Sequence, residues 1–486
     1  MKGGCRWLFC LLSVFYLGAS AQTLQELSEA DLPLLDIVTV DGLVPPCEVA
    51  YAPEGCLGVT IVNNSYVPGR MVMTLHGDTL YDSGPYEKST SGMRIKRRGN
   101  STGAYLDQHP YKLKLSKKYD LLMRDDSRLR HKEWLLLSMY TWNIKMANAE
   151  SNLLFMMGNI VSRLFGVEWV PDYTFVNVRL NGDYQGLYYL AEAVAHGKGR
   201  IDVADTGFII EHDAFWWKED VFFKTDAQPQ AFGFTYKYPD DDDVTDSIQT
   251  VISSFMNLAE TAVFGGDNDV ADYLDLESFA RWILVHDLLG SSDAAGCNRF
   301  LYKYDLEEAN ALSSKLKMGP LWDFDSSFLS DSYSTLHDLE SFYFPSLFQH
   351  TAFLEHYVAL WKQERATLDC DLQRAFSEAA SRFEKPFNES MLLHKQVFPG
   401  EGKNDFASQV EEIQKKLGLR ILLVDGIVEQ LDNVIALGLP QSQADVRLVS
   451  VCDFSGVSYQ VSQQVALPHG FYIFTYSNGM RRKVRR

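Results

Sequence analysis

Cysteine is scarce in this chain of 486 residues, and none of its spacings is typical of a metal site. Two of the 7 cysteines, Cys5 and Cys10, fall in the first 21 residues. No Cys-x-x-Cys pair or Cys/His spacing is present, which excludes a zinc finger, and so few cysteines in so long a chain exclude a disulfide scaffold. Cys47 and Cys56 lie in a loop with proline and glycine, so they are candidates for one disulfide bridge in an oxidising compartment.

Long hydrophobic runs are also missing beyond the N-terminus. After residue 21 no stretch offers about 18 uncharged apolar residues, so no membrane-spanning helix is predicted for the mature chain. Residues 1–21 have the form of a secretory signal, with Lys2 and Arg6 before an apolar run and Ala19-Ser20-Ala21 at its end. We therefore expect a secreted or cell-surface protein.

An excess of positive charge is absent too. The formal net charge is −19, which argues against nucleic acid or anionic lipid as the main partner. So acidic a surface is compatible with the binding of basic proteins. Two basic stretches, Arg94–Arg98 and Lys112–Lys118, are the exceptions. Positive charge gathered near one loop suits an anionic ligand such as a polyphosphate.

The pattern that is present predicts a strand-rich first half and a helix-rich second half. Alternating and apolar runs separated by Gly, Pro and Asn indicate an antiparallel β region at the front. Amphipathic runs predict helices over much of 336–437, and β-type sequence returns at 446–486. No repeat or low-complexity linker occurs. The predicted elements that bear on the site are strands at Leu32–Asp41, Gly69–His76, Pro110–Lys118 and Trp134–Tyr140, a helix from about Ala147 to Phe165, and a hairpin of Tyr173–Leu180 with Tyr184–Ala191.

The segment Ser291–Ser330 carries the strongest chemical signal. Asp293 follows an apolar helix, Asn298 comes five positions later, and two predicted strands then lead to Asp323 and Asp325. Protein kinases use this order of a catalytic Asp, an Asn on Mg²⁺, two strands and an Asp on Mg²⁺. The two strands are predicted at Arg299–Asp305 and Lys315–Trp322.

The chemistry explains why those residue types are needed. Phosphoryl transfer requires a base that orients the attacking hydroxyl and oxygen ligands that hold Mg²⁺ against the phosphates. A hairpin would bring the two loops side by side. The structural alternative stays open, because Asp and Asn are common in turns and helix caps. The acidic run Asp240–Asp243 is interpreted as solvated charge near a helix N-terminus rather than as a metal site.

Several motifs that together cover roughly residues 32 to 437 occur in a characteristic order. They are Arg98-Gly99-Asn100-Ser101-Thr102, Pro110-Tyr111-Lys112-Leu113-Lys114-Leu115, Val176–Glu192, Asp293-x4-Asn298 with Phe300-Leu301-Tyr302-Lys303, and Gly319-Pro320-Leu321-Trp322-Asp323-Phe324-Asp325. In combination they resemble the CotH kinase family, the secreted or spore-coat-associated atypical kinases.

The resemblance implies an α+β fold of the atypical protein-kinase-like, two-lobe type. Its N-terminal part would be β-rich, its C-terminal part largely helical, and a short β segment would follow. The expected divisions are a signal peptide at 1–21, an N-terminal β region at 22–90, a CotH-like kinase domain at 91–440 and a C-terminal β segment at 446–486. The last segment resembles the sorting tails of surface-secreted bacterial proteins, and a plain hairpin packed on the body is the alternative.

The resemblance also assigns the catalytic and metal-binding roles. Asp293 would accept or orient the proton of the acceptor hydroxyl. Asn298 and Asp323 would hold Mg²⁺ or Mn²⁺. Asp325 is the rival ligand, because Trp322–Asp325 offers two carboxylates. Asp323 is preferred, since Asp-Phe mimics the metal-binding tripeptide of kinases, although the glycine of that tripeptide is absent.

The phosphates of ATP would lie under the first motif. Gly99 allows close approach of the backbone, Arg98 brings charge, and Ser101 and Thr102 bring hydroxyls. Asn100, between Gly99 and Ser101, belongs to the same phosphate-binding motif.

Four further residues are candidates to line the cleft. Lys112 and Lys114 share one strand face, so either could bind the α- and β-phosphates, with Lys114 preferred. The alternative is that both are solvated on an edge strand. Glu192 and Glu211 end family-like strands, and a structural role is the alternative for each.

The leading functional hypothesis is a secreted, metal-dependent kinase that uses ATP to phosphorylate Ser or Thr of protein substrates, which we expect to be basic. The alternative is a non-catalytic surface or adhesion protein that retains the kinase-like architecture, since ATP is scarce outside the cytoplasm and fold does not determine function. Retention of Asp293, Asn298 and Asp323 favours chemistry. A metal-dependent hydrolase ranks last, because a His-rich ligand set is lacking.

Overall fold

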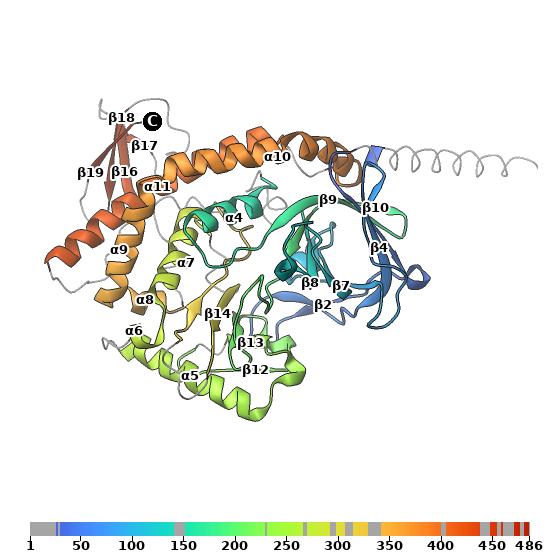
Figure 1. The fold of residues 1–486 in the computed structure, drawn as a ribbon. Helices are drawn as coiled ribbons and strands as arrows, with labels where there is room; N and C mark the ends of the chain where they lie inside the picture. The colour runs from blue at the N-terminus through green and yellow to red at the C-terminus, as the bar shows by residue number, and fades with distance from the viewer. Residues whose placement is uncertain are drawn as a thin grey trace, which may run out of the picture.

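The computed structural model describes residues 26–27, 30–139, 151–228, 231–265, 270–291, 298–306, 314–328, 342–399 and 405–437, together with four strands near the C-terminus. The chain is α+β, with strands concentrated in its first part and helices in its second, as predicted. Figure 1 shows the β-rich part on one side and helices α9 and α11 on the other, with α10 running along the top toward β9 and β10.

The first sheet has eight strands in the order β1-β9-β10-β8-β7-β6-β4-β5. Because β1 also pairs with β4, every strand except β5 belongs to a closed ring. All of these pairings are antiparallel except that of β1 with β9. The strands are β1 (Leu34–Thr39), β4 (Val67–Leu75), β5 (Asp78–Asp82), β6 (Met93–Arg97), β7 (Tyr111–Tyr119), β8 (His131–Ser138), β9 (Tyr173–Leu180) and β10 (Asp183–Glu192).

Strict alternation along β7 explains how this sheet presents charge. Tyr111, Leu113 and Leu115 are buried in the core inside the ring, while Lys112 and Lys114 lie on the other face. Side chains of successive strand residues point to opposite faces, so the predicted split of this strand is confirmed. β7 lies between β6 and β8, and the alternative of an edge strand is therefore wrong.

The boundary predicted between residues 90 and 91 falls inside the first sheet. Strands β1, β4 and β5 share that sheet with β6 to β10, because β4 pairs with both β1 and β6. Only the hairpin of β2 (Glu48–Tyr51) and β3 (Val59–Val62) stands apart, as a two-stranded sheet. The hairpin predicted around Asn181-Gly182 is present, with φ of 52° and 92° at its two turn residues.

A second sheet has the order β12-β13-β11-β14-β15 and is antiparallel. One of its faces, with Ile210, Leu301 and Tyr236, packs on the main helical core. The other carries Phe300, which joins Leu135 of β8 in a smaller apolar cluster, so this face is turned toward the first sheet. The strands are β11 (Phe208–Asp213), β12 (Phe222–Phe223), β13 (Gly233–Tyr238), β14 (Arg299–Lys303) and β15 (Lys317–Met318).

Helices cover the second sheet and reach back to the first (Figure 1). One of the two longest, α10, reaches β9 and β10, where Asn177 donates to Ser390 Oγ at 3.0 Å and the Leu187 N–H donates to His394 Nδ1 at 3.1 Å. The longer described helices are α4 (Leu154–Leu164), α5 (Asp246–Gly265), α7 (Leu276–Leu289), α9 (Thr351–Arg365), α10 (Leu368–Val397) and α11 (Phe406–Leu437).

The shorter described elements complete the fold. A four-stranded sheet lies in the C-terminal segment, in the order β17-β16-β18-β19, where β-type sequence was predicted. Its strands are β16 (Leu448–Asp453), β17 (Ser458–Tyr459), β18 (Phe471–Tyr476) and β19 (Arg481–Arg485). The short helices are α2 (Ser101–Tyr105), α6 (Val270–Tyr273), α8 (Phe344–Leu347), η1 (Val40–Gly42), η2 (Ser127–Leu129), η3 (Trp216–Lys218) and η4 (Asp241–Asp243).

Candidate functional site

A small cavity brings together the two motifs that the sequence analysis singled out. Arg98 and Thr102 of the first motif and Asp323 and Asp325 of the last line the same pocket, whose volume is about 80 Å³. This is far below the roughly 300–1,000 Å³ of typical small-molecule sites. The cavity has room for an ion with a few water-sized groups, but not for a whole nucleotide.

Packing between the two sheets explains why these motifs meet. Trp322 joins Phe300 of the second sheet to Leu135 of the first, and to Ala193 directly after β10, in one apolar cluster. The Arg98 guanidinium lies over the Trp322 ring, with Cζ 5.8 Å from its centre. The carboxylates that follow Trp322 are thereby held at the end of β6, from which Arg98 extends.

The pocket carries charge of both signs. Burial lowers the pKa of Arg98, while the carboxylates of Asp323 and Glu211 act in the opposite direction and favour its charged form. An arginine between two carboxylates can hold an anionic ligand beside a cation. Glu211, which sequence analysis placed at the edge of the cleft, therefore acts on this pocket electrostatically.

Asn298 and Asp323 lie next to each other, as the kinase-like order requires. Asn298 Nδ2 is 3.5 Å from Asp323 Oδ2, and the Asp325 N–H is 3.4 Å from Asp323 Oδ1. Both Asn298 and Asp323 adopt left-handed backbone conformations, with φ of 61° and 58°. Asn and Asp adopt this conformation more readily than other residues with a side chain, and it occurs in turns as well as at functional sites. The oxygen-rich set of Asn298, Asp323 and Asp325 fits a hard divalent cation such as Mg²⁺ or Mn²⁺.

Asp293 lies outside the described residues, but the start of its loop is placed. Ser291 directly follows the C-terminal glycine of α7, and its hydroxyl is 2.8 Å from the hydroxyl of Ser326. The Phe328 N–H donates to Leu289 O at 3.1 Å. These two contacts tie the segment after Asp323 to the end of the helix that leads toward Asp293.

The remaining residues of the first motif do not line the small pocket. Gly99 has a φ of 95°, and an added Cβ would lie 2.9 Å from the Gly103 N atom, so glycine is required there. Asn100 Oδ1 accepts from Thr60 Oγ1 at 2.7 Å and from Lys218 Nζ at 2.8 Å. Ser101 is exposed at the start of α2. Asn100 thus ties the motif to β3 and to the segment before β12, a role that sequence analysis did not foresee.

Lys112 and Lys114 share one carboxylate. Lys112 Nζ lies 2.9 Å from Glu133 Oε2 and Lys114 Nζ lies 3.4 Å from Glu133 Oε1. Burial alone would raise the pKa of Glu133, but the two ammonium groups lower it to about 2. Sequence analysis missed Glu133. A signal was available, because residues that face each other on paired strands interact, and Glu133 lies on the strand that follows the one carrying both lysines.

A second lysine–glutamate pair faces this one from the other sheet. Lys237 of β13 lies 2.8 Å from Glu211 of β11. Burial would lower the pKa of Lys237, but Glu211 and Asp213 raise it. Burial lowers the pKa of Lys112, and the charge of Lys237 adds to that effect, which places the two ammonium groups near each other. Both sheets therefore contribute cationic groups to one charged layer, in which a carboxylate neutralises each of them.

We predict a pH-dependent stability change from Asp213 in this layer. Burial and the neighbouring Glu211 raise the pKa of Asp213 to about 7. Between about pH 3.9, its ordinary pKa, and pH 7 the folded state holds a proton that the unfolded chain has lost, so stability falls as the pH rises through this interval. In Asp213→Asn this loss should disappear. The difference in free energy of unfolding between the variant and wild type should therefore be larger at pH 8 than at pH 4, in favour of the variant, by on the order of a few kcal/mol.

Urea unfolding at several pH values measures this difference. Asp242→Asn, a substitution in the exposed acidic run before α5, serves as the matched control and should track wild type. An Asp213→Asn curve parallel to that of wild type between pH 4 and pH 8 would rule out the proposed titration.

Glu192 has a structural role. Its Oε1 accepts from Arg124 at 2.6 Å and its Oε2 accepts from the Asp172 N–H at 2.9 Å. With 1% of its surface exposed, this side chain is fully engaged at the end of β10.

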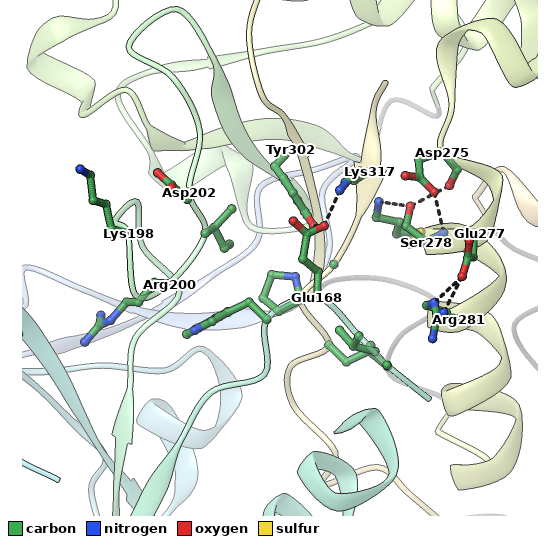
Figure 2. A pocket seen from close by; sticks show the side chains of 18 residues that line it. Glu168, Lys198, Arg200, Asp202, Asp275, Glu277, Ser278, Arg281, Tyr302 and Lys317 are labelled. Atoms are coloured by element: carbon green, nitrogen blue, oxygen red, sulfur yellow. Dashed lines mark hydrogen bonds and ion pairs between the residues drawn. The ribbon is translucent and has the colours of Figure 1, made fainter. Parts of the chain in front are cut away.

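A larger cavity lies elsewhere and contains none of the predicted site residues. It has a volume of about 420 Å³ and lies between the segment after α4, residues 198–202, the start of α7 and β15. Figure 2 shows Glu168 meeting Tyr302 and Lys317 in its middle, while Glu277 meets Arg281 on its α7 wall. These four charged groups form two ion pairs, and Lys198 and Asp202 also line the cavity.

Within the described residues no group of three or more His, Cys, Asp or Glu residues is arranged to hold a metal ion. None of the described helices is long and apolar enough to cross a membrane. Cys47 and Cys56 are both free thiols, so the candidate disulfide between them is absent.

Comparison with known proteins gives one family. A family model described as CotH kinase protein matches residues 95–420. This range includes the Arg98–Thr102 motif, both lysines of β7 and the segment from Asn298 to Asp325. No curated protein matches the chain at a significant level.

Proposed function

Because the chain belongs to the CotH kinase family, we propose that it is a metal-dependent kinase that transfers the γ-phosphate of ATP to Ser or Thr hydroxyls of proteins. One observation supports this most directly. Arg98 and Thr102 line one pocket with Asp323 and Asp325, although the two motifs are far apart in the chain. Phosphoryl transfer depends mainly on positioning and electrostatic stabilisation, and this pocket combines an arginine with two carboxylates.

In this proposal the first motif and the charged layer bind the phosphates. Arg98 supplies a planar cation at the pocket, and Gly99 lets the backbone approach closely. The small pocket holds the reacting end, while the rest of the nucleotide lies along the layer between the sheets. Lys112 and Lys237 lie there, one from each sheet, and to bind phosphate they would have to exchange Glu133 and Glu211 for it as partners.

The divalent cation would be held by Asp323, with Asn298 and Asp325 beside it. When bound, the cation neutralises charge on the phosphate oxygens and fixes their orientation. The Asn298 amide and the Asp323 carboxylate lie beside each other, with Asn298 Nδ2 3.5 Å from Asp323 Oδ2, and Asn298 would bind the cation through its amide oxygen.

Asp293 acts on the acceptor. Its carboxylate takes the proton of the Ser or Thr hydroxyl as that oxygen bonds to the γ-phosphorus, and the bond between this phosphorus and the bridging oxygen of ADP breaks. The contacts of Ser291 with Ser326 and of Phe328 with Leu289 support this role, because they couple the start of the Asp293 loop to the segment after Asp323.

The fold and composition support two wider parts of the proposal. In this proposal the first sheet would form the N-terminal lobe of a kinase, and the second sheet with its helices would form the C-terminal lobe. The signal-like residues 1–21 support secretion or display at the cell surface, and the acidic net charge of −19 supports basic protein substrates.

Transfer of label from γ-labelled ATP tests this function. Purified protein with Mg²⁺ or Mn²⁺ should label itself or a basic, Ser-containing acceptor, and acid hydrolysis should release phosphoserine or phosphothreonine. A chelator should abolish the labelling. If the protein neither binds nucleotide nor transfers label, the non-catalytic surface protein becomes the better explanation.

A further inference from the structure

Asn152 lines the small pocket and precedes α4 by two residues. Only 3% of its surface is exposed. Sequence analysis did not select it, because its partners come from distant parts of the chain. They are Met139, Tyr189 and Gln409.

Three of the four polar groups of Asn152 are engaged by buried partners. Its N–H donates to Gln409 Oε1 at 2.7 Å, and its carbonyl accepts from the Tyr189 hydroxyl at 2.8 Å. Its side-chain Nδ2 donates to Met139 O at 2.8 Å. These bonds hold the residue in place and determine which end of the amide is the oxygen.

The fourth group, Asn152 Oδ1, has no hydrogen-bond partner in the part of the chain that the structure describes, and it is shielded from solvent. Buried acceptors are nearly always paired in native proteins, since leaving one unpaired costs free energy. An exception in the wall of a pocket with two carboxylates points to a ligand that donates or coordinates there.

We propose that Asn152 Oδ1 accepts a hydrogen bond from a water molecule on the divalent cation held beside Asp323 and Asp325. The inference rests on the proposed function for the identity of the cation. Mg²⁺ gives up its waters reluctantly and usually keeps several when a protein binds it through one or two carboxylates. The pocket volume of about 80 Å³ leaves room for such waters.

Charge and geometry favour this ligand over a direct contact with phosphate. An amide oxygen with a fixed orientation can only accept, so it repels phosphate oxygens and attracts a metal-bound water, whose hydrogens are polarised by the cation. Arg98, which also lines this pocket, is the group suited to the phosphate.

Mn²⁺ binding to the full chain without nucleotide tests the role, followed as the loss of the free-ion signal in electron paramagnetic resonance. Asn152→Ala and Asn152→Asp both lose the Nδ2 bond to Met139, but only the alanine variant also loses the oxygen. We expect Asn152→Ala to weaken Mn²⁺ binding by about tenfold or more and Asn152→Asp to bind at least as tightly as wild type.

Asn159→Ala is the matched control. Asn159 is a second buried asparagine, on α4, with 1% exposure and no side-chain partner among the described residues, and it does not line the pocket. This variant should bind Mn²⁺ like wild type. Equal weakening in Asn152→Ala and Asn152→Asp would reveal a structural role and overturn the proposal.

The failure of the proposed function is distinguishable from the failure of this inference. Wild-type protein that binds Mn²⁺ through Asn152 but transfers no label would reject the kinase and keep the cation contact. Wild-type protein that binds no Mn²⁺, or Asn152→Ala that binds it with unchanged affinity, would reject the contact.

Discussion

Asp323→Ala is expected to reduce label transfer from ATP by at least about a hundredfold, because it removes the pocket carboxylate that lies beside Asn298. Asp325→Ala should reduce it less. Asp325 lines the same pocket. Its backbone N–H lies 3.4 Å from Asp323 Oδ1, and the alanine variant keeps this N–H, so the preferred ligand stays oriented. The measurement is the initial rate of transfer at saturating Mg²⁺ and ATP.

Asp78→Ala, in an exposed strand of the first sheet, is the matched control and should keep wild-type activity. Urea midpoints for all variants show whether a loss of rate reflects unfolding. If Asp325→Ala is the more damaging of the two pocket variants, the assignment of the primary metal ligand must be reversed. If neither variant loses activity, the pocket is not the site of transfer.

Asp293→Asn separates metal binding from action on the acceptor. Its carboxylate is proposed to act on the hydroxyl, so the variant should lose transfer while it still binds Mn²⁺ with an affinity close to that of wild type. Asp323→Ala should lose both. A parallel loss of Mn²⁺ binding in Asp293→Asn would make Asp293 a metal ligand instead.

Gly158→Ala is expected to damage both stability and transfer. Gly158 lies in α4, and a Cβ there would enter the space of the Phe324 ring. Phe324 is 1% exposed and also lies against His286 and Phe155, with ring centres 6.3 and 6.5 Å away, so it has little room to move. Overpacking of this kind costs about 1–3 kcal/mol of stability.

Activity should fall further than stability, because Phe324 stands between Asp323 and Asp325 in the chain. A displacement of about 1 Å at a reacting centre can reduce the rate on the order of a hundredfold. Transfer rate and urea unfolding, measured on the same preparation, separate the two effects. A Gly158→Ala protein with wild-type rate would show that the position of Phe324 does not control the carboxylates.

Gly418→Ala provides the matched control for that variant. Gly418 is a helical glycine in α11, and no atom lies within 4 Å of its added Cβ. Because alanine is the better helix former by about 1 kcal/mol, this substitution should stabilise the protein slightly and leave transfer unchanged. The contrast isolates the contact with Phe324 from the general effect of replacing a helical glycine.

Local rules predicted those parts of the structure that depend on neighbours in the chain. The alternation of Tyr111 to Leu115 predicted which face of β7 carries lysine, since strand periodicity is a local property. Asn181-Gly182 predicted a hairpin for the same reason. The second strand predicted at Lys315–Trp322 is shorter, with only Lys317–Met318 paired as β15. Pro320 cannot donate to a strand ladder, and sequence analysis gave it too little weight.

Partners that come from distant segments could not be predicted in this way. Glu133 holds both lysines of β7, and Lys218 engages Asn100, so a residue expected at the phosphates instead connects two parts of the fold. No sequence periodicity predicts such pairs, because the distance between the two side chains depends on how the strands and sheets pack. The same holds for Asn152, whose unpaired oxygen is defined only once Met139, Tyr189 and Gln409 are in place.

The order of residues along the chain was therefore enough to identify the family, the α+β class and the chemistry of the residues that belong to its motifs, since these depend on residue type and spacing. Which of those residues share a pocket was decided by tertiary packing. Trp322 and its neighbours between the two sheets bring Arg98 to Asp323, while Asn100 and Ser101 are directed elsewhere. The physical reason is that a binding site requires several side chains to converge within a few ångströms, and only the burial of apolar surface between distant segments brings them there.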